Sequence, residues 1–121
     1  MLMVKKYRAM FHISSFDDRM FGRMMSNIKN LVTDLGDDEV DIAVVANGDG
    51  VKHFTKSSLK EKGLEEIMNM LKWKVRFYIC RNSLRALGIK EEEILEHFEI
   101  VPAGITQIVK LQSEGFAYIK P

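Results

Sequence analysis

The chain carries the sequence VDIAVVA at residues 40–46, followed directly by NGDG at residues 47–50. The first stretch is short and almost entirely apolar, which is typical of a strand in a parallel sheet that is covered on both faces. The second stretch contains Asn, Asp and two Gly residues, which favour a tight turn. Together the two stretches predict a buried strand that ends at residue 46.

Four further segments also predict strands, because they are rich in apolar and aromatic residues and are bounded by polar turns. Between them lie segments with apolar residues spaced three and four apart, which predict amphipathic helices. Strands and helices that alternate in this way form right-handed crossovers and a parallel sheet. We therefore expect a three-layer α/β fold with a five-stranded parallel sheet, helices on both faces, and one domain over residues 1–121. The expected strands are residues 8–13, 40–46, 74–80, 99–101 and 116–119.

The helices between these strands are predicted from their caps and their apolar spacing. A capping box that begins at Ser58 predicts one helix that continues to residue 71. Pro102 marks the expected start of the last helix. The side chains that we expect on the buried face of that helix are Ile105, Ile108 and Val109. The other expected helices span residues 20–35, 82–87 and 91–97.

The composition excludes several classes of protein. Lys and Arg total 18 against 17 Asp and Glu, so the formal net charge of +1 gives no general attraction to nucleic acid or to a membrane surface. No run approaches the roughly 18 apolar residues that span a bilayer, so we expect neither a nucleic-acid nor a membrane partner. The first residues place an apolar part before a basic part, which is the reverse of a signal peptide. We therefore expect a cytoplasmic location, where the single cysteine, Cys80, stays a free thiol.

The motifs that hold common cofactors are not present. The segment Gly48-Asp49-Gly50 has His53 where the dinucleotide-binding fingerprint needs a third glycine, and it follows the second strand rather than the first. The Gly-Lys-Ser/Thr sequence of a phosphate-binding loop is absent. The histidines and the single cysteine do not have the spacing of a metal site. We expect no cofactor and no metal.

The expected strand ends indicate where a site should lie, because ligands of open parallel sheets bind beyond the carboxyl ends of the strands. Cys80 is the last residue of its expected strand and precedes a helix, and both the helix N-terminus and Arg81 favour a thiolate there. A buried, unreactive cysteine is the alternative, since free cysteines are often buried. His12 fits either a structural histidine or a proton acceptor for Cys80. The residues that these strand ends bring to one edge are His12, Ser14, Asn47, Gly48, Cys80, Arg81, Asn82, Pro102 and Gly104.

Several segments resemble one known family. Residues 101–105 (VPAGI) and residues 111–121 (LQSEGFAYIKP) resemble the C-terminal signature of DsrE/DsrF-like proteins, also called YchN-like sulfur-relay proteins. Residues 11–13, 44–48 and 79–84 agree with this family, so the resemblance spans nearly the whole chain. It implies a flavodoxin-like fold and a homotrimer or homohexamer. It also implies that Cys80 carries sulfane sulfur as a persulfide, with Ser83 among the binding residues. Many relatives have a histidine at the position of Asn47.

The leading hypothesis is therefore a cytoplasmic sulfur carrier. The Cys80 thiolate would take sulfur from a donor protein with a reactive cysteine and pass it to a similar acceptor. Such a protein is a sulfurtransferase-like carrier without strong turnover chemistry. The sequence does not decide whether it acts as an enzyme. The alternative is an oligomeric module without chemistry that binds a small anionic or nucleotide-like ligand through backbone N–H groups at the same strand ends. A redox sensor that uses Cys80 needs the same exposed thiol and also stays open.

Overall fold

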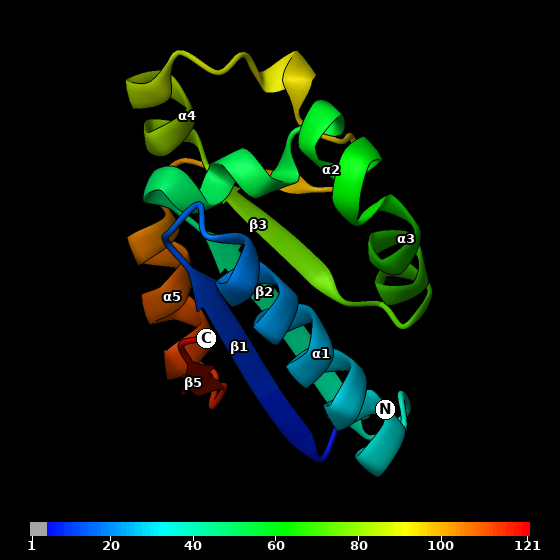
Figure 1. The fold of residues 1–121 in the computed structure, drawn as a ribbon. Helices are drawn as coiled ribbons and strands as arrows, with labels where there is room; N and C mark the ends of the chain where they lie inside the picture. Colours follow the sequence, from blue (N-terminus) through cyan, green and yellow to red (C-terminus); the bar gives the residue numbers. More distant parts are fainter. Residues whose placement is uncertain (1–4) are drawn as a thin grey trace.

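The computed structural model describes residues 5–121. Residues 1–4, which contribute to the prediction that no signal peptide is present, lie outside this range. The five strands of the described residues form one sheet, in which all pairs are parallel and the order is β4-β3-β2-β1-β5 (Figure 1). The strands are β1 (Tyr7–Ile13), β2 (Val40–Ala46), β3 (Arg76–Cys80), β4 (Glu99–Val101) and β5 (Ala117–Ile119).

Helices cover both faces of this sheet, which confirms the predicted three-layer α/β fold. The strand order in flavodoxin itself is 2-1-3-4-5, so the likeness to flavodoxin lies in the layers and the parallel strands. The helices are α1 (Asp18–Leu35), α2 (Lys56–Lys62), α3 (Leu64–Lys72), α4 (Arg81–Leu87) and α5 (Gly104–Ser113), with two 3₁₀-helices, η1 (Gly48–Phe54) and η2 (Glu91–Glu93).

The two faces of the sheet are packed very differently. Successive strand residues point to opposite faces, so Phe11, Val44 and Phe77 enter a large apolar core with residues of α1, α2, α3, η1 and α4. A smaller core on the other face contains Met10 and Val45 and is covered by α5. Figure 1 shows α1 and α5 on opposite sides of the sheet.

The helix expected from Ser58 to residue 71 is two helices. Thr55 is the N-cap of α2, and its hydroxyl oxygen accepts a hydrogen bond of 3.2 Å from the backbone N–H of Ser58. The predicted start at Ser58 is therefore wrong, because an earlier hydroxyl caps the same turn. Gly63 divides α2 from α3, since glycine stabilises a helix interior poorly.

The buried face of α5 also differs from the prediction. The helix begins at Gly104 after an extended Ala103, so Pro102 lies in the short loop between β4 and α5 and is not part of the helix. Its buried residues are Gly104, Ile108 and Leu111, while Ile105 is 62% and Val109 is 57% exposed. Only Ile108 was placed correctly. Apolar spacing fits either of two neighbouring stripes on this helix, and the contact with the sheet selects one of them.

Two other segments differ in their secondary structure from the sequence prediction. The turn after β2 continues as η1, which buries Val51 and Phe54 in the large core. The helix expected over residues 91–97 is limited to η2, after which Ile94 and Phe98 enter the same core. In the second segment the contact of Ile94 and Phe98 with the core overrides the local helical spacing.

The chain reverses its direction across the sheet after β4. The helix that follows β3 lies on the side of the large core, because Leu84 of α4 packs there. The helix that follows β4 lies on the opposite side, because Ile108 and Leu111 of α5 enter the small core. The carboxyl ends of β3 and β4 therefore form a topological switch point, which is where open α/β sheets bind their ligands.

Candidate functional site

Hydrogen bonds join the segments that follow β2, β3 and β4. The backbone N–H of Asn82 donates to the carbonyl oxygen of Pro102 at 3.3 Å. The backbone N–H of Gly48 donates to the hydroxyl oxygen of Ser83 at 2.7 Å. The structure thus brings the loops that carry Gly48, Cys80 and Gly104 into one continuous edge of the sheet.

Gly104 lies at the centre of this edge. A Cβ atom built on it would be 3.0 Å from Cβ of Asn47 and 3.3 Å from Cβ of Cys80. These distances are shorter than ordinary side-chain contacts, so a side chain at residue 104 would require its neighbours to shift, and the glycine allows the start of α5 to approach β2 and β3 this closely. The close approach brings both Asn47 and Cys80 next to Gly104.

Cys80 is the N-cap residue of α4 and is 5% exposed. Burial raises the pKa of its thiol, but the hydroxyl of Ser83 and the backbone N–H groups of Gly104, Ser83 and Asn82 lower it, and the net shift is downward. In the described conformation the sulfur makes no capping hydrogen bond to the first turn of α4. The groups near Cys80 thus make its thiol more acidic than an ordinary cysteine.

Arg81 does not add its charge to the sulfur as the sequence suggested. Its Nε donates to Oε2 of Glu91 at 3.0 Å, and its Nη2 donates to Oε1 of the same carboxylate at 3.5 Å. This ion pair connects the start of α4 to η2. Arg81 therefore has its own partner outside the site.

A chain of side-chain hydrogen bonds begins next to Cys80 and runs across β1. The Nε2 atom of His12 lies 2.8 Å from Oδ1 of Asn47, and its Nδ1 atom lies 2.6 Å from the hydroxyl of Tyr118. Nearby, the ammonium group of Lys120 donates to the hydroxyl oxygen of Ser14 at 3.0 Å. Sequence reasoning missed Tyr118 and Lys120, because only the pairing of β5 with β1 brings the C-terminal residues to this edge.

A second polar cluster holds the loop after β1 from the other side. His53 is fully buried and stacks on Phe21, with ring centroids 4.6 Å apart. Its Nε2 lies 2.9 Å from the carbonyl oxygen of Ser15, and its Nδ1 lies 2.7 Å from Nζ of Lys62. Lys62 also donates to Asp18 at 2.6 Å. The cluster links the loop that carries Ser14 to η1 and α2, and it does not touch Cys80.

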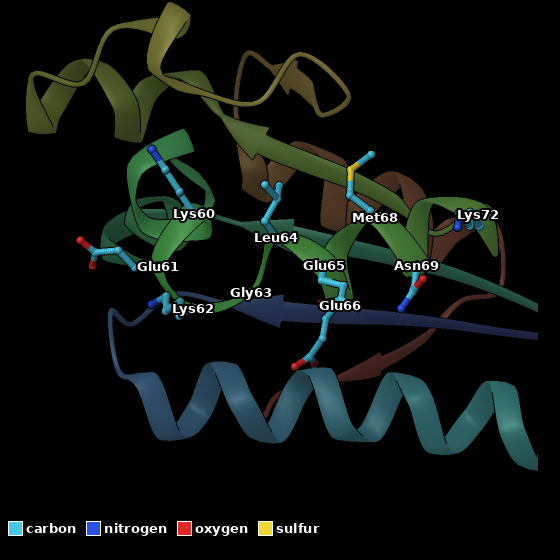
Figure 2. Close-up of a pocket in the computed structure, with 10 residues that line it drawn as sticks. All are labelled: Lys60, Glu61, Lys62, Gly63, Leu64, Glu65, Glu66, Met68, Asn69 and Lys72. Atoms are coloured by element: carbon cyan, nitrogen blue, oxygen red, sulfur yellow. The ribbon is translucent and has the colours of Figure 1, made fainter.

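A depression of about 780 Å³ lies away from Cys80, along α2 and α3. Its wall includes three lysines and three glutamates. Figure 2 shows that these side chains do not converge, because Lys60 and Met68 point away from α1 whereas Glu66 points towards it. Mixed charges that point in different directions are typical of a solvated surface, so we do not place the site there.

The described residues also bear on metal binding and on membrane crossing. Among residues 5–121, no group of three or more His, Cys, Asp or Glu side chains is arranged to hold a metal ion. Within the same range, no helix combines the length and the apolar character that crossing a membrane requires.

Comparisons with solved structures find the same fold in proteins of similar length. The protein of unknown function MTH1491 from Methanobacterium thermoautotrophicum is 36% identical, with a TM-score of 0.86 over 95% of this chain and 99% of that one. The ychN protein from E. coli is 10% identical, with a TM-score of 0.76 over 98% and 100%. The conserved protein of unknown function BT1422 from Bacteroides thetaiotaomicron is 14% identical, with a TM-score of 0.68 over 94% of each chain.

A search of curated proteins finds no match. The model of the DsrE/DsrF-like family, in contrast, matches residues 9–121, which include the carboxyl ends of all five strands. The match confirms the resemblance that the C-terminal segment carries. The chain therefore belongs to the DsrE/DsrF-like family.

Proposed function

We propose that the protein carries sulfane sulfur as a persulfide on Cys80. The observation that supports this proposal is the position of a single thiol at the switch point of the sheet, at the N-cap of α4 and next to the start of α5. Burial alone would raise the pKa of that thiol, whereas the Ser83 hydroxyl and the N–H groups of Gly104, Ser83 and Asn82 lower it below its usual value. Membership of a family that includes sulfur-relay proteins agrees with this chemistry.

In the loading step, the Cys80 thiolate attacks the outer sulfur of a donor persulfide. A bond forms between Sγ of Cys80 and that sulfur, the S–S bond of the donor breaks, and its electron pair leaves with the inner sulfur as a thiolate. In the delivery step, an acceptor thiolate attacks the outer sulfur, and Cys80 leaves as a thiolate. A lowered pKa serves both steps, because the thiolate is the attacking species and also the leaving group.

The burial of Cys80 is compatible with this cycle. The residue is 5% exposed, and the proposed cycle requires that this small exposed surface admits the donor and the acceptor. A persulfide places the reacting atom about 2 Å further out, because that is the length of an S–S bond. The inner sulfur can therefore stay among its donors while the outer sulfur meets the acceptor.

The single cysteine decides what happens to the sulfur next. With no second thiol in the chain, a Cys80 persulfide cannot resolve into an internal disulfide. The sulfur must leave to another molecule, so the partners we propose are donor and acceptor proteins with reactive cysteines. The proposal also implies a cytoplasmic protein, since a lone thiol stays reduced there.

We further propose that the protein forms a homo-oligomer, either a trimer or a hexamer. Ile105 and Val109 lie one turn apart on α5 and are 62% and 57% exposed. Side chains at positions i and i+4 share one helix face, so they form an apolar ridge. Contact with a second copy would remove this ridge from water.

A second candidate function is binding of a small anion without chemistry. The limited exposure of Cys80 favours it, because a ligand held by the N–H groups at the start of α5 does not require an accessible sulfur. In that case Cys80 would only fill space at the edge of the sheet.

Intact-mass spectrometry after treatment with a small-molecule persulfide separates the two functions. A carrier gains one sulfur atom, and the gain disappears in Cys80→Ser and on addition of an excess of a small thiol. The binding module gains no sulfur, and its Cys80 reacts slowly with iodoacetamide at neutral pH. A wild-type protein that stays unmodified would rule out the carrier.

A further inference from the structure

We infer that Tyr118 and His12 are positioning residues, which hold the Asn47 side chain with its NH₂ group turned towards the outer sulfur of a Cys80 persulfide. The inference rests on the proposed function, since it concerns the persulfide form of Cys80. It assigns the outer sulfur a hydrogen-bond donor of its own, separate from the donors that surround the inner sulfur.

The order of the strands indicates in which direction the amide nitrogen of Asn47 points. The sheet places β2 between β1 and β3, so Asn47 stands between His12 on one side and Cys80 on the other. The amide oxygen of Asn47 is turned to His12, with Oδ1 lying 2.8 Å from Nε2. The nitrogen of an amide points away from its oxygen, and therefore away from β1 and towards β3.

Gly104 keeps the space between Asn47 and Cys80 short. The two Cβ atoms lie 3.0 Å and 3.3 Å from the same point, the position that a Cβ of Gly104 would occupy. An asparagine side chain reaches across such a gap, and a persulfide extends Cys80 by about 2 Å in addition. The amide nitrogen and the outer sulfur are therefore the atoms that meet.

The proton position on the His12 ring determines whether the Asn47 amide turns its oxygen or its nitrogen towards His12. A neutral imidazole has one donor and one acceptor nitrogen. Burial lowers the pKa of His12, the Asn47 hydrogen bond opposes this effect, and Lys120 adds to the lowering, so the ring is neutral near pH 7. If Nε2–H donates to Asn47, then Nδ1 must accept, and the hydroxyl of Tyr118 is the donor 2.6 Å away.

The reversed chain would turn the amide oxygen towards the sulfur. In that arrangement Nδ1–H donates to Tyr118, and the Asn47 NH₂ group donates to Nε2. A carbonyl oxygen next to a sulfur anion is repelled, whereas an N–H group next to it is attracted. The negative charge of the persulfide therefore selects the chain that starts at the Tyr118 hydroxyl.

The donors near the inner sulfur do not supply a hydrogen bond to the outer sulfur of the persulfide. The Ser83 hydroxyl and the N–H groups of Gly104, Ser83 and Asn82 act on Sγ of Cys80. In a persulfide the charge resides on the outer sulfur, one bond further from these groups. A donor on β2 complements them from the side that they do not occupy.

The test measures how fast the persulfide reacts with an alkylating agent as a function of pH. Protein loaded with a small-molecule persulfide is treated with monobromobimane, and the midpoint of the pH profile reports the ionisation of the outer sulfur. We expect Asn47→Leu to raise this midpoint by about one pH unit, the size of one hydrogen bond to a charged group. Tyr118→Phe should raise it less, because water can replace part of the orienting effect at a side chain that is 42% exposed.

The double variant shows whether Tyr118 acts through Asn47. In the Asn47→Leu background, Tyr118→Phe should have no additional effect, because the amide that it orients is gone. Tyr7→Phe is the matched control, since Tyr7 lies at the other end of β1 and is 44% exposed. In Asn47→Leu and Tyr118→Phe, the pH profile of the unloaded Cys80 thiol should change little. A general loss of structure would change the profiles of the loaded and the unloaded protein together.

Each outcome has a defined meaning. A lowered midpoint in Asn47→Leu would show the reversed chain, and an equal effect of Tyr118→Phe in both backgrounds would show that it does not act through Asn47; either result overturns the inference. If Asn47→Leu does not fold, an unchanged midpoint in Tyr118→Phe overturns it alone. Wild-type protein that cannot be loaded removes the proposed function and this inference with it, whereas loading with unshifted midpoints removes the inference only.

Discussion

The hydroxyl oxygen of Ser83 accepts a hydrogen bond of 2.7 Å from the backbone N–H of Gly48. The oxygen is thereby tied to the loop after β2, and its proton is free to face Cys80. Burial raises the pKa of the Cys80 thiol, and among the groups that lower this pKa the Ser83 hydroxyl has the largest effect. A strand end from one part of the chain thus orients a hydroxyl on α4 that stabilises a thiolate at the end of β3.

Replacing Ser83 with alanine should make Cys80 less acidic. The thiolate loses a donor, so we expect the thiol pKa to rise by about one unit, because a hydrogen bond to a charged group contributes about 1.5–3 kcal/mol. The pH dependence of alkylation by iodoacetamide measures the change. Ser113→Ala, at an exposed position at the end of α5, is the control. An unchanged profile in Ser83→Ala would show that the hydroxyl does not face the sulfur.

Gly104→Ala should disturb the site from its centre. The added methyl group would lie 3.0 Å from Cβ of Asn47 and 3.3 Å from Cβ of Cys80, so the start of α5 or these two side chains must shift. We expect a loss of about 1–3 kcal/mol in the free energy of unfolding and slower sulfur loading. Denaturant unfolding and intact-mass spectrometry measure the two effects.

Gly22→Ala provides a control of opposite sign. A Cβ at Gly22 meets nothing within 4 Å, and the residue lies in the interior of α1. Alanine is the better helix former by about 0.5–1 kcal/mol, so this variant should be more stable and should load sulfur normally. A Gly104→Ala protein as stable and as reactive as Gly22→Ala would contradict the close approach at Gly104.

His53 should make the protein sensitive to acid. Burial and Lys62 lower its pKa from 6.5 to about 4, against the opposing effects of the Ser15 carbonyl, Asp18 and Asp17. The unfolded chain therefore binds a proton at a higher pH than the folded chain does, and the free energy of unfolding falls as the pH drops from about 6.5 to 4. The loss from this group is on the order of 2–3 kcal/mol, and it is absent above pH 6.5.

Denaturant unfolding at several pH values tests the role of His53. His53→Gln should flatten the dependence between pH 4 and 6.5, because the titrating group is gone. His97→Gln, at an exposed position after η2, should leave it unchanged. A steep dependence that persists in His53→Gln would assign the acid sensitivity to other groups.

The exposed ridge on α5 predicts how the oligomer can be broken. A lysine at Ile105 or Val109 would put a charge into an apolar contact between copies, so size-exclusion chromatography with light scattering should show smaller species. The monomer should stay folded, because both side chains are more than half exposed. Thr106→Lys, on the neighbouring exposed face of α5, is the control. A wild-type protein that is already a monomer would contradict the proposed assembly.

Local sequence is sufficient for the strands and for the position of Cys80. The stretch VDIAVVA at residues 40–46 forms β2 with its predicted bounds, and Cys80 ends β3 as expected. Strands of a covered parallel sheet are continuous apolar runs, and the residues that follow them must gather at one edge. The sequence therefore determined the fold class and indicated which loops meet, before any contact was known.

Tertiary structure alone decided which helix faces are buried and which groups surround the sulfur. Apolar spacing on α5 fitted two stripes, and only contact with the small core selected Ile108 and Leu111 over Ile105 and Val109. Tyr118 joins His12 because β5 pairs with β1, a choice that local residues do not encode. The physical reason is that local patterns report each segment's own preference, whereas strand order and helix registration depend on contacts between distant segments.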